Sequence, residues 1–543
     1  MIVDPGSLKQ RLTAAKVMLD TGMFAPTWPD RTIRTLALLR RWGPTPAAAY
    51  MASAIRHPQR AALIDERGVL SFREIDRRTN ALARELRASG VDEQDGVAIM
   101  CRNHRGFIEA TVAASKLGAS ALYLNTAFAG PQIADVLERE APVAVIYDEE
   151  FAELIDAGAR ARKRFVAWGS AGAGGAGEAD RAPLLEELIE RGDESGLQAP
   201  AERGRVVILT SGTTGTPKGA ARKQPDSFEP AAALFSKIPL RARETTMIAA
   251  PMFHSWGFAH FTLALPLSST LVLQRRFDAE ETLRAVSQHA ASALVLVPVM
   301  LQRILELGEQ TIARYDLSSL KVIALSGSAL PGELATRAMD AFGDVLYNLY
   351  GSTEVAWATI ATPEDLRAAP GTAGRPPLGT VVKLLDSEGT EVPAGETGRI
   401  FVGNEMVFEG YTGGGGKEMV RGLMSTGDVG RLDPDGRLFV EGRDDEMIVS
   451  GGENVFPREV EDLLADHEAI DEAAVVGVED EQFGQRLRAF VVVHAGAELS
   501  EADVQAYVRA NLARFKVPRE VVFVAELPRN ATGKVLKREL QAS

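Results

Sequence analysis

The segment Ile208–Ala220 reads ILTSGTTGTPKGA, and it directs the prediction of both fold and site. The short apolar run Val206–Leu209 is typical of a buried strand, and glycines, hydroxyl residues and a lysine follow it directly. Glycines let the backbone approach an anion, N–H groups and hydroxyls donate to phosphate oxygens, and lysine adds positive charge. The segment therefore predicts a phosphate-binding loop after a strand. Its contributing residues are Thr210, Ser211, Gly212, Thr213, Thr214, Gly215 and Lys218.

This loop differs from the Walker A loop of P-loop nucleotidases. A Walker A loop has glycine before its lysine and serine or threonine after it, whereas here Pro217 precedes Lys218 and Gly219 follows. The pattern therefore disfavours a kinase or a P-loop nucleotidase. A loop rich in glycine and threonine also fits a flexible turn, so its assignment depends on the rest of the chain.

Around the loop, from about residue 60 to residue 345, short β-branched runs alternate with helical patterns. This alternation predicts an α/β fold with parallel sheets flanked by helices. One helix is expected over Ser71–Arg87, because Ser71 and Glu74 have the spacing of a capping box. The other expected strands are Val97–Met100, Val143–Tyr147, Leu271–Leu273, Leu294–Val297 and Val322–Leu325.

The sequence pattern changes after Asn348. Turns rich in glycine and aspartate separate short strands such as Gly398–Gly403, which predicts a small β-rich subdomain. From Arg443 a compact α+β segment is expected, with Pro457 opening one helix and Ser500 capping another. The sequence thus predicts a large N-terminal domain, residues 1–442, and a small mobile C-terminal domain, residues 443–543. The Gly/Ala-rich stretch 169–177 is expected to connect two subdomains.

Composition excludes several classes of protein. The chain has 543 residues, 45% of them apolar, and a formal charge of −14, which fits a multidomain globular protein and disfavours nucleic-acid binding. Its single cysteine, Cys101, cannot form an intramolecular disulfide or a thiolate cluster and fits a reducing compartment. No signal peptide and no apolar run long enough to span a bilayer are apparent, so a cytoplasmic location is expected.

The first 50 residues have a different charge balance, with seven basic residues and three acidic ones. Leucines lie between the arginines of this segment. It either packs against the body of the protein or makes peripheral contact with an anionic membrane surface, and the sequence leaves both readings open.

Four further motifs join the phosphate loop in a defined order: Tyr350-Gly351-Ser352-Thr353-Glu354, Ser425-Thr426-Gly427-Asp428, Gly442-Arg443-Asp444-Asp445 and Pro528–Lys534. With these five motifs the chain resembles the adenylate-forming superfamily of acyl-CoA synthetases, luciferases and adenylation domains over nearly its whole length. The resemblance implies an enzyme that uses ATP, Mg²⁺ and coenzyme A.

The resemblance also implies roles for individual residues. Lys534 would bridge the reacting carboxylate and the α-phosphate, Thr353 would donate to that phosphate, and Glu354 would hold Mg²⁺. Tyr350 would offer a flat face to adenine, and Asp428 would accept both ribose hydroxyls, with Arg443 nearby. The remaining implied residues are Gly327 and Ser328 beside the adenine, Asp445 at a hinge, and Ser450, Gly451, Gly452 and Glu453 along the coenzyme A channel.

The segment Ala250–Gly257 resembles the family's stretch beside the acyl pocket. Phe253 and Trp256 are expected to line that pocket, Gly257 to leave room for an acyl chain, and His254 either to gate the pocket or to sit in the core. The chain departs from the family before Asp428, where a usual Gly-Trp pair is replaced by Gly422-Leu423 after the glycine run Gly413–Gly416. This departure puts the local packing in question and leaves the adenylate chemistry intact.

The resulting hypothesis is a ligase that joins a medium- or long-chain fatty acid to coenzyme A. The alternatives are a ligase for aryl or bile-type acids, an acyl-AMP ligase that loads a carrier protein, and a catalytically silent scaffold on the same fold. The chain continues for nine residues after Lys534 without a fused carrier-like stretch, which favours free coenzyme A. The oligomeric state stays open, with a homodimer as one candidate.

Overall fold

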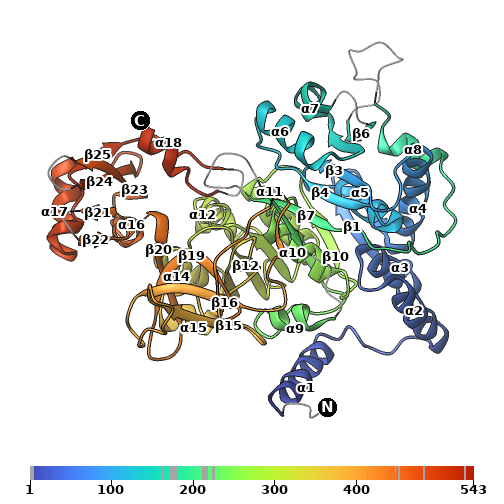
Figure 1. The fold of residues 1–543 in the computed structure, drawn as a ribbon, viewed down its shortest axis with the longest axis horizontal. Helices are drawn as coiled ribbons and strands as arrows, with labels where there is room; N and C mark the ends of the chain where they lie inside the picture. The colour runs from blue at the N-terminus through green and yellow to red at the C-terminus, as the bar shows by residue number, and fades with distance from the viewer. Residues whose placement is uncertain are drawn as a thin grey trace. The chain divides into compact units, whose positions relative to one another are not determined.

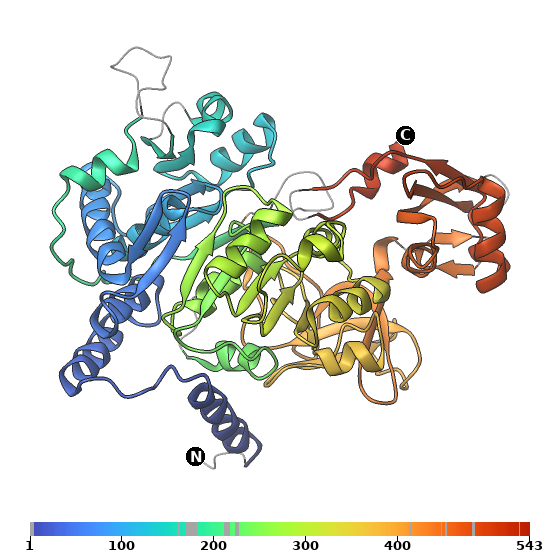
Figure 2. The same cartoon turned by 180° about the vertical axis from the view of Figure 1, so that it is seen from behind.

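A computed structural model describes residues 5–159, 163–169, 182–210, 218–222, 227–412, 414–446, 448–450, 453–480, 484–530 and 533–542 (Figures 1 and 2). The chain forms two compact units. The first comprises residues 1–296, 306–324 and 405–416, and the second comprises residues 297–305, 325–404 and 417–543. The predicted α/β class is confirmed, whereas the predicted boundary after residue 442 stays a prediction.

One sheet of the first unit has the strand order β12-β11-β9-β10-β1-β2. The pairs from β11 through β9 and β10 to β1 are parallel, and β2 joins antiparallel. Residues of β10, β11 and β12 are buried throughout, as expected for strands whose two faces are covered. The bounds are β1 (Ala61–Asp65), β2 (Gly68–Ser71), β9 (Thr245–Ile248), β10 (Thr270–Leu273), β11 (Ala293–Leu296) and β12 (Val322–Leu325).

A second sheet of the first unit has the order β17-β8-β7-β4-β3-β5-β6. The strands from β7 to β6 run parallel, and β8 and β17 extend the sheet antiparallel. The bounds are β3 (Gly96–Met100), β4 (Ser120–Tyr123), β5 (Ala144–Asp148), β6 (Lys163–Trp168), β7 (Val206–Thr210), β8 (Lys218–Arg222) and β17 (Gly410–Tyr411).

Helices of the first unit begin where the sequence signals predict. In α4 the Ser71 hydroxyl accepts from the Glu74 N–H while the Glu74 carboxylate accepts from the Ser71 N–H, which confirms the capping box. The helices are α1 (Pro5–Asp20), α2 (Pro29–Trp42), α3 (Pro46–Arg56), α4 (Phe72–Ala88), α5 (Arg105–Leu117), α6 (Gly130–Glu140), α7 (Ala152–Ala159), α8 (Leu185–Arg191), α9 (Glu229–Phe235), α10 (Ser255–Ala264), α11 (Ala279–Gln288) and α13 (Glu309–Ile312).

The second unit contains the predicted β-rich part. Strands β15, β16, β19 and β18 form an antiparallel sheet, to which β20 adds through β19. Its elements before residue 444 are α12 (Pro298–Leu305), α14 (Gly332–Phe342), β13 (Leu346–Tyr350), β14 (Thr359–Ala361), α15 (Pro363–Ala368), β15 (Val381–Leu385), β16 (Gly398–Gly403), β18 (Met419–Val420), β19 (Leu423–Leu432) and β20 (Leu438–Arg443).

The C-terminal segment has its own sheet, β22-β21-β24-β23, with β25 beside β24. Pro457 opens α16, and Ser500 caps α17, as predicted. Apolar side chains of these helices and strands form one core. The elements are β21 (Ile448–Ser450), β22 (Glu453–Val455), α16 (Pro457–Ala465), β23 (Ile470–Asp480), β24 (Gly484–Val493), α17 (Glu501–Asn511), β25 (Glu520–Phe523) and α18 (Lys537–Ala542).

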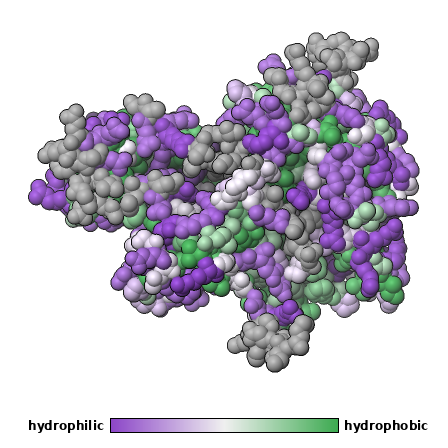
Figure 3. Space-filling model, in the orientation of Figure 1, coloured by the Kyte–Doolittle hydropathy of each residue, from purple (hydrophilic) through white to green (hydrophobic). Residues whose placement is uncertain are grey.

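The face drawn in Figure 3 is mostly hydrophilic, with smaller hydrophobic areas among the polar side chains. Among the described residues, no helix combines the length and the apolar character needed to cross a membrane. Most of the predicted Gly/Ala connection, residues 170–177, lies outside the described residues.

Candidate active site

Tyr350 and Asp428 meet through a short hydrogen bond in the second unit. Tyr350 ends β13, and its hydroxyl donates to Oδ2 of Asp428 at 2.5 Å, with the Thr426 hydroxyl at 3.3 Å. Burial raises the pKa of Tyr350 well above its ordinary value, so the phenol keeps its proton and donates. Burial also raises the pKa of Asp428, and the bond from Tyr350 and the charge of Arg443 offset part of that rise.

Three cations surround the Asp428 carboxylate. Arg443 lies on β20, and its Nη1 is 3.7 Å from Oδ1 of Asp428. The charges of Lys534 and Lys417 also favour the ionised carboxylate. Gly427 has a φ of +82°, and a Cβ at this position would lie 3.4 Å from both Lys417 Nζ and Arg443 Nη2. One carboxylate among three cations leaves an excess of positive charge, which suits a polyphosphate.

Lys417 is a residue that sequence reasoning missed. It follows the glycine run Gly413–Gly416, in the segment where the chain departs from the family pattern. A lysine directly after such a run, 11 positions before Asp428, was the signal available for finding it. The residues that replace the usual Gly-Trp pair thus accompany an additional cation near Asp428.

The Lys534 turn is fixed through its backbone. The Lys534 N–H donates to Oδ1 of Asn530 at 2.9 Å, and the Asn530 N–H donates to the Lys534 carbonyl at 2.9 Å. Gly533 has a φ of +79°, and a Cβ there would lie 2.4 Å from a Val299 methyl on α12. Only glycine fits this position, so the turn presents the exposed Lys534 side chain from a defined backbone.

The segment after Tyr350 is a tight turn. A Cβ on Gly351 would lie 2.3 Å from the Ala356 carbonyl oxygen, so the glycine permits a close approach of two backbones. The Ser352 hydroxyl accepts from the N–H groups of Glu354 and Val355 at 3.2 and 3.3 Å. Thr353 and Glu354 are half-buried in this turn. The Glu354 carboxylate is a hard oxygen donor of the kind that Mg²⁺ prefers.

Gly327 and Ser328 lie in the second unit, shortly after the end of β12. Gly327 has a φ of +99°, which a side chain would strain, and a Cβ there would lie 3.3 Å from a Val297 methyl. Ser328 is half-buried. The structure therefore gives a backbone reason for the glycine that sequence reasoning assigned to the adenine side.

Other predicted residues lie partly or wholly outside the described part of the chain. Thr210 pairs with Lys218 across β7 and β8, so the phosphate loop connects two antiparallel strands, while residues 211–217 lie outside the described residues. Ser450 pairs with Glu453 across β21 and β22, and Gly451 and Gly452 also lie outside. Asp445 falls in the 3₁₀ helix η2 (Asp444–Glu446). Their assigned roles stay predictions.

The acyl segment is anchored by Asn103, which sequence reasoning missed. The Asn103 amide donates to the carbonyls of Ile248 and Ala250 at 3.2 and 2.9 Å and accepts from the Met252 N–H at 2.9 Å. This buried carboxamide therefore holds the backbone that leads into α10. Nothing in the local sequence around Asn103 signals this partner, because its bonds reach about 150 residues along the chain.

Phe253 and Trp256 are both buried, and Trp256 Nε1 donates to the Leu296 carbonyl at 3.0 Å. The acyl-pocket role of Gly257 stays a prediction. A Cβ there would lie 2.4 Å from the Pro251 carbonyl oxygen, so glycine permits this close approach of two backbone segments. Gly257 lets the first turn of α10 pack on the preceding segment.

Two histidines near α10 are neutral. His260 is 1% exposed, and neither of its ring nitrogens has a hydrogen-bond partner among the described residues. Burial lowers the pKa of His260 to about 3 and that of His254 to about 4. His254 Nε2 also has no partner in the described part of the chain. A polar group of a ligand, or water, would meet an unused ring nitrogen here.

The His260→Leu variant is expected to flatten the acid dependence of stability. Below about pH 6.5 the His260 side chain takes up a proton in the unfolded chain and stays neutral in the folded chain. The free energy of unfolding therefore falls as the pH decreases, by about 1.4 kcal/mol per pH unit for this residue. Leucine does not titrate, so the variant lacks this contribution to the slope. Urea unfolding between pH 6.5 and pH 4.5 measures both slopes, and identical slopes would contradict the neutral buried state.

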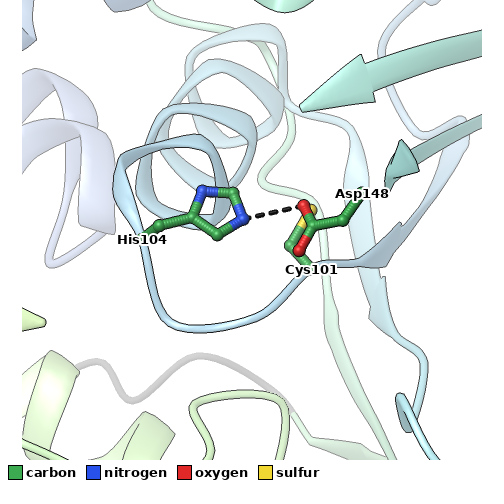
Figure 4. A group of neighbouring side chains, drawn as sticks. All are labelled: Cys101, His104 and Asp148. Carbon is green, nitrogen blue, oxygen red and sulfur yellow. Dashed lines mark hydrogen bonds and ion pairs between the residues drawn. The ribbon is translucent and has the colours of Figure 1, made fainter. Parts of the chain in front are cut away.

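A second group of potential ligand atoms lies at the carboxyl ends of β3 and β5. Cys101, His104 and Asp148 are buried, and their ligand atoms lie within 4.8 Å of one another (Figure 4). His104 Nδ1 accepts from the Gly106 N–H at 3.0 Å, so Nε2 carries the proton that it donates to Asp148 at 2.7 Å. Asp148 also accepts from the Arg102 N–H at 2.9 Å. Because a metal would have to displace these bonds, the cluster is structural.

Comparisons with known proteins agree with this geometry. Residues 51–412 match the model of the AMP-binding enzyme family, and residues 459–534 match that of the AMP-binding enzyme C-terminal domain. An indoleacetate–CoA ligase of Aromatoleum aromaticum is 34% identical over 496 residues, covering 90% of this chain and 94% of the relative. A fatty acid–[acyl-carrier-protein] ligase of Streptomyces coeruleorubidus is 28% identical, covering 90% and 94%.

Solved structures give the same result. The o-succinylbenzoate CoA synthetase of Bacillus subtilis, in complex with its acyl-adenylate intermediate, superposes with a TM-score of 0.79 at 27% identity, covering 91% of this chain and 98% of that one. The chain belongs to the AMP-binding enzyme family. This membership confirms that the chain belongs to the adenylate-forming superfamily, as the five motifs predict.

Proposed function

We propose that the protein is an AMP-forming ligase that joins an aromatic carboxylic acid to coenzyme A. The observation that carries the ligase part is the Tyr350–Asp428 pair with Arg443, Lys417 and Lys534 around it. The aromatic preference is supported by the rings packed at the start of α10, where Phe253 contacts His254 at 4.6 Å and Trp256 contacts His260 at 4.4 Å between centroids. The names of the indoleacetate and o-succinylbenzoate relatives point the same way.

The first half-reaction overcomes the poor reactivity of a carboxylate. A carboxylate oxygen attacks the α-phosphorus of ATP, the bond to the β-phosphate breaks, and pyrophosphate leaves with the electron pair. Two anions approach each other in this step, so fixed cations lower its barrier. Lys534 would contact both anions, and Arg443 and Asp428 would hold the ribose side. Glu354 would hold Mg²⁺, which supplies charge neutralisation at the phosphates.

The second half-reaction transfers the acyl group to a thiol. The thiol of coenzyme A loses its proton to water, and the thiolate attacks the acyl carbon. AMP leaves as its phosphate oxygen takes the electron pair of the broken acyl C–O bond. This step needs a thiol path to the adenylate. We propose that Ser450 and Glu453, which pair next to the turn of a short hairpin, line this path. The hinge at Asp445 would bring them to the adenylate.

A fatty acid is the second candidate substrate, and the relative that ligates a fatty acid to a carrier protein favours it. The two candidates share the adenylation chemistry and differ in the acid and in the acceptor thiol. A carrier protein in place of coenzyme A is the corresponding alternative acceptor.

A substrate panel distinguishes these candidates. Indole-3-acetate, benzoate, a phenylpropenoate and octanoate are each incubated with ATP, Mg²⁺ and coenzyme A, and pyrophosphate and thioester are measured. We expect kcat/KM for the best aromatic acid to exceed that for octanoate about tenfold or more, because pocket contacts discriminate by this order. A preference for octanoate would overturn the aromatic proposal. Pyrophosphate release without thioester formation would indicate that the acceptor is a thiol other than coenzyme A.

A further inference from the structure

The two N-terminal helices and the segment that joins them carry large apolar side chains exposed to solvent. Trp28 is 72% exposed and Ile33 is 67% exposed. The described remainder of the chain has exposed large apolar residues only at scattered positions between residues 69 and 523, so the N-terminal group is a local concentration. This exposed apolar group consists of Leu12, Leu19, Phe24, Trp28, Ile33 and Leu36.

The exposed residues follow helical spacing. In α1, Leu12 and Leu19 are seven positions apart on one side, while Ala14 and Met18 are buried on the other. In α2, Ile33 and Leu36 share the outward side, and Thr35 and Trp42 are buried. After the inward face of each helix is packed, its outward face therefore still exposes large aliphatic side chains.

Positive charge borders these side chains. The exposed cations of the two helices are Arg11, Lys16, Arg34, Arg40 and Arg41, and the exposed acidic residues are Asp20 and Asp30. The whole chain has a formal charge of −14, so the charge balance of these helices is opposite to that of the chain as a whole. An apolar stripe bordered by arginine and lysine is the composition of helices that lie in the interface of an anionic membrane.

The helices are attached to the body of the first unit. Arg31 on α2 donates to the Arg56 carbonyl at 3.0 Å, and Arg56 on α3 donates to the Met23 carbonyl at 2.7 Å. The family match begins at residue 51, so α1 and α2 precede the residues that match the catalytic family. A function of their outward faces is therefore separate from the adenylation chemistry.

We propose that α1 and α2 dock the protein on the surface of an anionic phospholipid bilayer. The exposed apolar side chains enter the boundary between headgroups and acyl chains, and the arginines and lysines pair with lipid phosphates. A second copy of the chain fits less well, because two such faces would bring like charges together. The contact is peripheral.

Co-sedimentation of the full chain with vesicles tests this surface. Vesicles of phosphatidylcholine alone are compared with vesicles that also contain phosphatidylglycerol, at low and high salt. We expect binding to the anionic vesicles to be about tenfold or more tighter, and to weaken as salt screens the charges. The double variants Leu19→Glu/Leu36→Glu and Arg34→Glu/Arg40→Glu should each lose about tenfold or more of that binding.

Matched controls make the result specific. Val69→Glu places the same charge on another exposed apolar residue of the first unit, and Arg314→Glu reverses another exposed cation, so both should bind vesicles like the unaltered protein. ATP-dependent pyrophosphate release should be unchanged in all variants without vesicles. Equal binding to both vesicle types, no binding, or equal losses in the controls would overturn the proposal. Self-association that Leu36→Glu abolishes, without vesicle binding, would assign the face to a second copy instead.

Discussion

Replacing Lys534 by alanine is expected to reduce ATP-dependent pyrophosphate release about 100- to 1,000-fold, the cost of removing one fixed charge from a developing anionic transition state. The side chain is exposed, and the turn that holds it depends on Asn530 and Gly533, so the fold should survive the change. The measurement is the rate of pyrophosphate release at saturating ATP and acid, with thioester formation from a supplied acyl adenylate recorded separately.

The adenylate-fed reaction separates a role in the first half-reaction from general damage. Thioester formation from the supplied adenylate should fall far less than pyrophosphate release, because that step has no carboxylate and triphosphate to bring together. Arg538→Ala, which removes an exposed cation four residues later, is the matched control and should retain both activities. Equal losses in both half-reactions of Lys534→Ala would contradict the proposed bridge.

The Asp428→Asn variant is expected to raise the KM for ATP about 10- to 100-fold, which corresponds to the loss of a hydrogen bond to a charged acceptor. The hydrogen bond from Tyr350 can persist to the amide oxygen, so the local packing should be preserved. The charge of the carboxylate is lost while Arg443, Lys417 and Lys534 remain. Phosphate attraction therefore persists, and recognition of the ribose is what should decline.

The comparison of ATP with 2′-deoxy-ATP measures this directly. The unaltered enzyme should discriminate between them, and Asp428→Asn should discriminate much less. Asp435→Asn removes the same charge from the turn between β19 and β20 and serves as the control. A variant with a normal KM and full discrimination would exclude Asp428 from ribose binding.

Local signals predicted the elements well. The strand expected at Val322–Leu325 has those bounds in the structure, and the strand expected at Val97–Met100 begins one residue earlier. The helix caps at Ser71 and Ser500 are also as predicted, because a capping box depends on residues three apart. Such features depend on residues that are only a few positions apart in the sequence.

The motifs predicted which residues belong to the site, but they did not predict how these residues contact one another. The ribose role of Asp428 stays a prediction, and the hydrogen bond that Tyr350 donates to one of its oxygens was not foreseen. Asn103 was missed because its partners lie about 150 residues along the chain. Lys417 lies only 11 residues before Asp428, and the glycine run before it was a local signal that was not used. The close approach of Gly257 to the Pro251 and Ala250 carbonyls was also not foreseen. The Tyr350–Asp428 and Asn103 contacts join segments far apart in sequence, and motif spacing does not encode such packing.

The burial of Cys101 has a practical consequence for enzymology. Its thiol is fully buried, and burial together with Asp148 raises the pKa of the thiol. The chain has no second cysteine. A colorimetric thiol reagent added to the folded enzyme therefore counts only the free coenzyme A in the cuvette, and the same reagent reports one sulfur per chain when the protein unfolds. One dye thus follows both turnover and denaturation without any engineered label.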